Sequence, residues 1–204
     1  MGSLAHLNLR GIRDTYGLKS FVETGTGDGH SVALAIAGGF EAVHSIEIVP
    51  ELAHAASVKF ARYPQVRIHA GASSLLLPGI IDELPEGPAL FWLDAHFPGA
   101  DYGMGEYDGE KDVDRRLPLQ TEVELIATLR KGCRDLLIID DARIYQSGPY
   151  GAGDLPADWP PLVGLKDRSL DFVRRAFGET HGIVVDYRDQ GYVMVAPHVN
   201  ASRL

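Results

Sequence analysis

Apolar residues along the chain form short continuous runs that alternate with longer stretches of helical spacing. Five such runs predict buried β-strands and span residues 20–23, 42–48, 66–69, 89–94 and 136–141. Helical spacing recurs between them, for example after Pro50 and after Pro118, because proline suits the first turn of a helix. Alternation of this kind is typical of an α/β fold in which helices connect parallel strands.

The two ends of the chain extend this pattern. Residues 4–16 predict a helix ahead of the first strand. Near the other end, the apolar stretches 182–187 and 191–196 are separated by the short polar segment 188–190, which is typical of an antiparallel hairpin. We therefore predict a single domain over residues 1–204, with a doubly wound, mostly parallel seven-stranded sheet that ends in this hairpin.

Composition and charge narrow the classes of partner. The 204 residues carry a net charge of −9 without a cluster of Lys and Arg, which argues against a nucleic-acid partner. Cys133 is the only cysteine, so an internal disulfide is excluded and a reducing compartment is favoured. No apolar stretch reaches the ~18 residues of a membrane span, and a signal peptide is not evident. We expect a cytoplasmic protein without a membrane partner, and a homodimer as the commonest assembly of such proteins.

The stretch Phe-Val-Glu-Thr-Gly-Thr-Gly-Asp-Gly at residues 21–29 is the clearest candidate for a binding site. An apolar strand leads into an acid and then into glycines at every second position, ahead of a predicted helix. Glycine suits a turn whose backbone takes a positive φ or closely approaches a ligand. Glu47 follows at the end of the next strand, where an acid suits a ribose diol. The turn therefore predicts a nucleoside-type cofactor.

Three features of the turn distinguish between such cofactors. A dinucleotide fingerprint requires a glycine where this chain has His30, and a phosphate-binding P-loop motif is absent. Glu23, just before the turn, disfavours a phosphate and suits a ligand with a positive charge, such as a sulfonium. These features favour S-adenosylmethionine (SAM).

Residues 23–29 resemble motif I of the class I SAM-dependent methyltransferases, and Glu47 matches their ribose-binding acid. Three short matches, at 29–31, 45–48 and 71–73, are similar to the catechol-type metal-dependent O-methyltransferases and to the macrocin-type sugar O-methyltransferases. The resemblance implies a Rossmann-like methyltransferase fold, with Ser31 at the methionine carboxylate and Ser73 at the adenine. The implied cofactor-binding residues are Glu23, Thr24, Gly25, Gly27, Gly29, Ser31, Glu47, Ile48, Ala72 and Ser73.

Acids also end the fourth and fifth predicted strands. The same resemblance places metal ligands on Asp94, Asp140 and Asp141. Because neighbouring strands lie about 4.8 Å apart, these carboxylates would repel unless one is protonated or a cation neutralises them. Ligands that are all oxygen select Mg²⁺, Ca²⁺ or Mn²⁺. The alternative is that Asp140 or Asp141 only caps the following turn.

The general base is a separate question. Where the catechol-type enzymes carry a lysine base, this chain has Phe97. His96 is the nearest substitute, with Asp94 as a second candidate, although His96 suits equally a polar loop residue or a substrate contact. In the expected reaction, an acceptor oxygen attacks the sulfonium methyl in line, and a metal that touches this oxygen lowers its pKa.

The two long predicted loops, 97–117 and 144–166, are expected to cover the site. The acidic segment 101–116 is interpreted as a solvated loop, with a lid and attraction of a cationic substrate as the alternatives. Arg143 and Tyr145 are candidates to face the substrate.

The first functional hypothesis is a metal-assisted SAM-dependent O-methyltransferase acting on a small molecule, such as a sugar, a catechol-like compound or a natural product. The alternatives are a metal-free methyltransferase acting on nitrogen or another acceptor, and a non-catalytic SAM- or nucleotide-binding module. An NAD-dependent oxidoreductase is disfavoured by the absence of glycine at His30.

Overall fold

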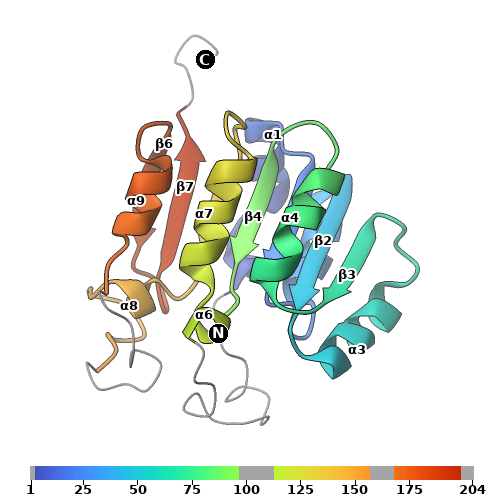
Figure 1. Cartoon of the computed structure of the whole chain (residues 1–204), viewed down its shortest axis with the longest axis horizontal. Coiled ribbons are helices and arrows are strands. Elements are labelled where there is room, and N and C mark those ends of the chain that lie inside the picture. Colours follow the sequence, from blue (N-terminus) through green and yellow to red (C-terminus); the bar gives the residue numbers. More distant parts are fainter. Residues whose placement is uncertain (1–2, 97–112, 157–167, 199–204) are drawn as a thin grey trace.

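The chain folds around a seven-stranded sheet with the strand order β3-β2-β1-β4-β5-β7-β6 (Figure 1). The computed structural model describes residues 3–96, 113–156 and 168–198. The strands are β1 (Ser20–Thr24), β2 (Ala42–Glu47), β3 (Val66–Ala70), β4 (Ala89–Leu93), β5 (Leu136–Ile139), β6 (His181–Asp186) and β7 (Tyr192–Pro197). Strands β1 to β5 pair in parallel, whereas β7 is antiparallel to both β5 and β6. The predicted mostly parallel sheet and its C-terminal hairpin are confirmed.

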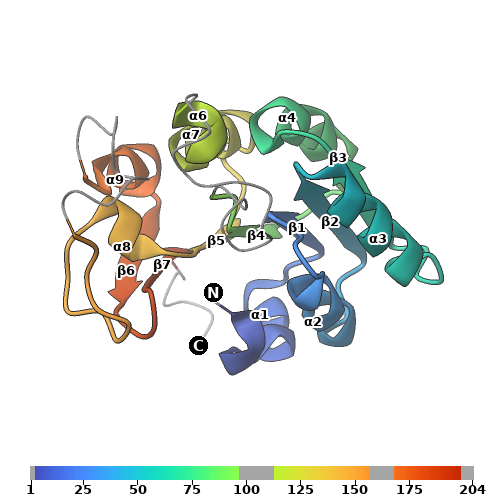
Figure 2. The same ribbon diagram turned by 90° about the horizontal axis from the view of Figure 1, so that it is seen from below.

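Helices cover both faces of the sheet (Figure 2). The described helical segments are η1 (Leu4–His6), α1 (Leu9–Tyr16), α2 (His30–Gly38), α3 (Pro50–Phe60), α4 (Ser73–Glu83), α6 (Val113–Arg116), α7 (Leu119–Leu129), α8 (Ala142–Tyr145) and α9 (Asp171–Phe177). Helices α4, α7 and α9 lie on one face, and α1 and α2 lie on the other (Figures 1 and 2). This arrangement is the doubly wound layering that the alternation of strands and helices predicts.

The central strand β4 shows why the apolar runs of the sequence become strands. All of its residues are buried, because helices cover it from both sides. Leu90 and Trp92 pack into the cluster with α1 and α2, whereas Phe91 and Leu93 pack into the cluster with α4, α7 and α9. Side chains alternate in direction along a strand, so a continuous apolar run places buried apolar side chains on both faces of the sheet.

Local details differ from the prediction at several positions. The helix predicted over residues 4–16 is broken, because the Asn8 side chain accepts a hydrogen bond from the Gly11 amide and begins a new helix there. The short helices α6 and α8 lie in segments predicted as loops. Residues 97–112 and 157–167, which include Phe97 and most of the acidic segment 101–116, lie outside the described residues.

Strands β4 and β5 also end earlier than predicted. Asp94 follows β4, and Asp140 and Asp141 follow β5 instead of belonging to it. Asp141 has a φ of 51°, in the left-handed region, and is the N-cap of α8. The alternation of side chains along a strand therefore does not apply to Asp140 and Asp141, which can serve the same site.

No helix among residues 3–96, 113–156 and 168–198 has the length and apolar character to span a membrane. The single domain, the homodimer and the cytoplasmic location stay predictions.

His44 on β2 and His69 on β3 form a stacked pair beside the core. Their rings are 5.3 Å apart at an interplanar angle of 8°, and His44 Nδ1 lies 3.1 Å from His69 Nε2. Burial, with a smaller contribution from His69, lowers the pKa of His44 to about 4, and burial also lowers the pKa of His69. The folded state therefore holds both rings neutral, because a second proton would abolish the acceptor nitrogen of the pair.

This pair predicts a loss of stability in acid. Below pH ~6.5 the unfolded chain binds a proton on His44 that the folded state resists, so stability falls as pH drops toward about 4. Urea denaturation at pH 7.5, 6.0 and 5.0 should show a smaller loss for His44→Gln than for the unsubstituted chain. The exposed His54 on α3 provides the control, and His54→Gln should leave the pH dependence unchanged. An unchanged pH dependence in His44→Gln would contradict this account.

Candidate functional site

The turn after β1 contains three glycines whose backbone takes a positive φ. Gly25, Gly27 and Gly29 have φ values of 86°, 49° and 72°. A Cβ atom on Gly25 would lie 2.5 Å from the carbonyl oxygen of Asp94, and one on Gly29 would lie 2.6 Å from the Phe60 ring. The turn therefore passes directly against the end of β4, and only glycine allows this approach.

Glu23 is fully buried at the end of β1, beneath this turn. Ser45 donates a hydrogen bond of 2.5 Å to Glu23 Oε2, and the Ser45 and Thr26 hydroxyls lie 2.6 Å apart. Burial raises the pKa of Glu23 to about 8, and hydrogen bonds from Ser45 and Ser31 offset part of this effect. The group is therefore a buried acid whose ionised form would be favoured by a nearby positive charge.

Glu47 connects the end of β2 to the glycine turn. Its two carboxylate oxygens accept hydrogen bonds of 2.9 Å from the backbone amides of Gly27 and Val49. The side chain is only 3% exposed. Glu47 thus fixes the shape of the turn and places a carboxylate beside it, as the sequence predicts for a ribose-binding acid.

The remaining predicted cofactor residues lie along the same edge. Thr24 ends β1, Ile48 follows β2, and Ala72 and Ser73 follow β3 at the start of α4. Thr24 and Ser73 are buried, whereas Ile48 and Ala72 are half-buried. Because parallel strands end at one edge of the sheet, these residues form a rim that runs from the glycine turn toward β3.

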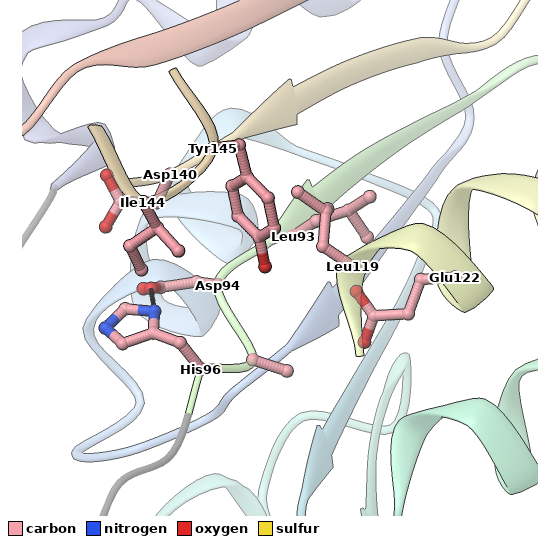
Figure 3. A pocket seen from close by; sticks show the side chains of 9 residues that line it. Leu93, Asp94, His96, Leu119, Glu122, Asp140, Ile144 and Tyr145 are labelled. Carbon is pink, nitrogen blue, oxygen red and sulfur yellow. Dashed lines mark ion pairs between the residues drawn. The ribbon is translucent and has the colours of Figure 1, made fainter. Parts of the chain in front are cut away.

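A second cluster lies on the other side of the turn, at the ends of β4 and β5. The His96 ring stands between two acids. Its Nδ1 lies 3.4 Å from Asp94 Oδ1 (Figure 3), and its Nε2 lies 3.2 Å from Asp141 Oδ2. Arg143 Nε lies 3.2 Å from the other oxygen of Asp141. The structure therefore brings together all four residues predicted for catalysis or metal binding, which are Asp94, His96, Asp140 and Asp141.

The acids of this cluster are tightly coupled. Burial raises the pKa of Asp94 well above its usual range, and Asp140 raises it further by its charge and by a shared hydrogen bond. Burial and the Asp141 carboxylate likewise raise the pKa of Asp140. One proton shared between Asp94 and Asp140 is one of the two outcomes expected when carboxylates crowd one region.

The second expected outcome was a divalent cation. Carboxylate oxygens suit such an ion, but both oxygens of Asp141 already lie next to side-chain nitrogens of His96 and Arg143. No group of three His, Cys, Asp or Glu side chains within the described ranges is arranged to hold a metal ion. As it stands, the arrangement does not fit a metal unless His96 or Arg143 moves away.

A pocket of about 230 Å³, part of it open solvent, adjoins this cluster. Besides Asp94, His96 and Asp140, it is lined by Leu93, Ala95, Leu119, Glu122, Ile144 and Tyr145 (Figure 3). Tyr145 is among the residues that the sequence suggested for substrate contact, whereas Glu122 was missed. The signal for Glu122 was present, because this acid stands within the apolar stripe of Leu119, Val123 and Ile126.

Comparison with known proteins identifies the fold. No protein-family model matches the chain, and no curated protein matches it in sequence. Among solved structures, one similar protein is from Staphylococcus aureus and is assigned as a caffeoyl-CoA O-methyltransferase. The alignment covers 97% of this chain and 85% of that protein, with 15% identity and a TM-score of 0.64. A second is an O-methyltransferase from Bacillus cereus in complex with S-adenosylhomocysteine (SAH). The alignment covers 93% of this chain and 79% of that enzyme, with 13% identity and a TM-score of 0.54.

A third structure is TomG from Streptomyces achromogenes, an O-methyltransferase involved in tomaymycin synthesis and solved in complex with SAM. The alignment covers 94% of this chain and 78% of TomG, with 14% identity and a TM-score of 0.53. The chain has the methyltransferase fold. At these identities the likeness concerns the fold alone, and it confirms the fold that the resemblance to methyltransferases implied.

The close approach at Gly25 gives a testable prediction. Gly25→Ala should lower the free energy of unfolding by at least about 2 kcal/mol, because the positive φ is strained and the added methyl meets the Asp94 carbonyl. Gly79 on α4 has nothing within 4 Å of an added Cβ, so Gly79→Ala should change stability by about 1 kcal/mol or less. Urea denaturation of both variants tests this, and equal effects would contradict the proposed packing.

Proposed function

We propose that this protein is a SAM-dependent methyltransferase that transfers a methyl group to a hydroxyl of a small molecule. One observation carries the proposal: the glycine turn, held by Glu47, passes directly against the Asp94 end of β4. A cofactor seated on the turn would therefore lie next to the cluster of Asp94, His96 and Asp141. The methyltransferase fold supports the same reading, since two of the similar structures contain SAM or SAH.

The cofactor is expected to lie along the rim of the sheet. Its ribose diol would bind the Glu47 carboxylate, and its methionine part would lie near Glu23 and Ser31. The buried Glu23 carboxyl would face a cationic part of the cofactor, which favours the ionised acid and offsets the cost of burying it. The base would extend over Ile48 toward Ala72 and Ser73.

The reaction is a displacement at the sulfonium methyl group. The acceptor oxygen forms a bond to the methyl carbon as the carbon–sulfur bond breaks, which leaves SAH as the second product. The hydroxyl proton passes to the pair of Asp94 and His96. Asp141, 3.2 Å from His96 Nε2, stabilises the imidazolium, and Arg143 holds Asp141 in place. Most of the rate acceleration comes from holding the two reactants in line at close distance.

No step in this account requires a metal ion. Mg²⁺, Ca²⁺ or Mn²⁺ at Asp94, Asp140 and Asp141 stays a prediction from the sequence, and the pairing of Asp141 with His96 and Arg143 favours the metal-free alternative. The acceptor is a small molecule in this proposal. The side of the pocket formed by Asp94 and Tyr145 is a candidate for part of its binding site.

Calorimetric titration with SAM tests the cofactor site. The unsubstituted protein should bind SAM, and Glu47→Ala should weaken binding by at least about tenfold, because it removes the ribose acceptor and frees the Gly27 amide. Glu51 is exposed in the first turn of α3, so Glu51→Ala should bind SAM like the unsubstituted protein. Absence of SAM binding in the unsubstituted protein would overturn the proposed function.

Transfer of a radiolabelled methyl group from SAM to a panel of catechols, sugars and other hydroxylated compounds tests the chemistry. His96→Ala should lower the rate by about 10²–10⁴-fold with little change in SAM affinity, whereas the exposed His54→Ala should not. Activity should survive exhaustive treatment with EDTA. Loss of activity in EDTA that added Mg²⁺ restores would contradict the metal-free route and support the ion predicted from the sequence.

A further inference from the structure

Glu122 is a buried acid with an unsatisfied oxygen. It lies in the first turn of α7, with 1% of its surface exposed. Within the described parts of the chain, its Oε1 atom has no hydrogen-bond partner. A carboxyl buried in this way is costly unless a donor satisfies it, so an apolar residue would stabilise the fold better at this position. The feature therefore suggests a role toward a ligand.

The partners that Glu122 does have belong to the cofactor rim. Thr24 donates a hydrogen bond of 3.4 Å to Glu122 Oε2, and Ser73 also hydrogen-bonds the carboxyl. Thr24 ends β1 just before the glycine turn, and Ser73 begins α4, which packs against α7. Glu122 thus reaches across from α7 to the ends of β1 and β3.

The carboxyl is directed into the pocket. Glu122 lines the pocket opposite Asp94 and His96, and Figure 3 shows its carboxylate turned toward the space between them. Ala95 also lines this space and leaves it open, because its side chain is a single methyl group. Consider a planar ring that begins at the ends of β2 and β3 and extends into this pocket. The far edge of such a ring would lie next to Glu122.

The chemistry of SAM suggests which group donates a hydrogen bond to Glu122 Oε1. With the ribose at Glu47, the attached base lies over Ala72 and Ser73, and its exocyclic amine is the donor group at its outer edge. We propose that Glu122 accepts a hydrogen bond from the exocyclic amino group of adenine, and so selects adenine over hypoxanthine. This inference rests on the proposed function, because it requires SAM or SAH on the glycine turn.

The electrostatics agree with this role. Burial raises the pKa of Glu122 to about 7, and the Ser73 and Thr24 hydroxyls offset only part of the effect. An additional donor at Oε1 complements the carboxylate. Hypoxanthine instead presents a carbonyl oxygen at the position of this amine, and that oxygen repels the carboxylate oxygen that would accept from the amine.

Calorimetric titration with SAH and with S-inosylhomocysteine tests the proposal, because the two ligands differ only at this edge of the base. At pH 8 the unsubstituted protein should bind SAH at least about tenfold more tightly. In Glu122→Gln the ratio should fall toward one, because a side-chain amide can donate to the hypoxanthine oxygen as well as accept from the adenine amine. A merely structural role for Glu122 would weaken both ligands equally.

Glu124 provides a matched control, since it is exposed on the same helix, and Glu124→Gln should keep the full preference for SAH. Equal binding of the two ligands by the unsubstituted protein would overturn the role of Glu122 while leaving the proposed function in place. An unchanged ratio in Glu122→Gln would do the same. Failure of the unsubstituted protein to bind either ligand would overturn both the proposed function and this inference.

Discussion

The close contact between the Gly25 turn and the carbonyl of Asp94 is the constraint on which the rest of the site depends. The space for a Cβ on Gly25 is filled by this carbonyl, at 2.5 Å, so the turn after β1 and the end of β4 cannot separate without breaking the packing of two central strands. Residues that bind a cofactor on the turn are thereby held beside residues that can act on an acceptor. The distance between these two functions is set by the parallel pairing of β1 with β4.

Several buried acids lie together at the edge where the parallel strands end, and burying them costs free energy. Burial raises the pKa values of four acids at this edge, Glu23, Asp94, Asp140 and Glu122, because it penalises their ionised forms. Local donors offset part of the cost, as Ser45 does for Glu23, but among the described residues one oxygen of Glu23 and one of Glu122 have no hydrogen-bond partner. Such clusters are expected at binding sites, because a ligand can supply the hydrogen-bond donors and positive charge that the buried acids lack.

Much of the fold and part of the site followed from the sequence for identifiable reasons. The apolar run of β4 and the glycines at 25, 27 and 29 are local signals, and the position of Glu47 after the next strand depends only on element order. The left-handed Asp141, the placement of His96 between two acids and the contact of Glu122 with Thr24 were not predicted. Each depends on tertiary packing: the Thr24 contact joins residues 98 positions apart, through the docking of α7 over the sheet.

A crystal structure of the protein with SAH tests the central claim most directly, because that claim concerns the position of the cofactor relative to two groups of residues. The account predicts SAH across residues 25–29, with its ribose hydroxyls at Glu47 and its sulfur facing Asp94 and His96. SAH bound elsewhere, or with its sulfur turned away from Asp94 and His96, would contradict the account.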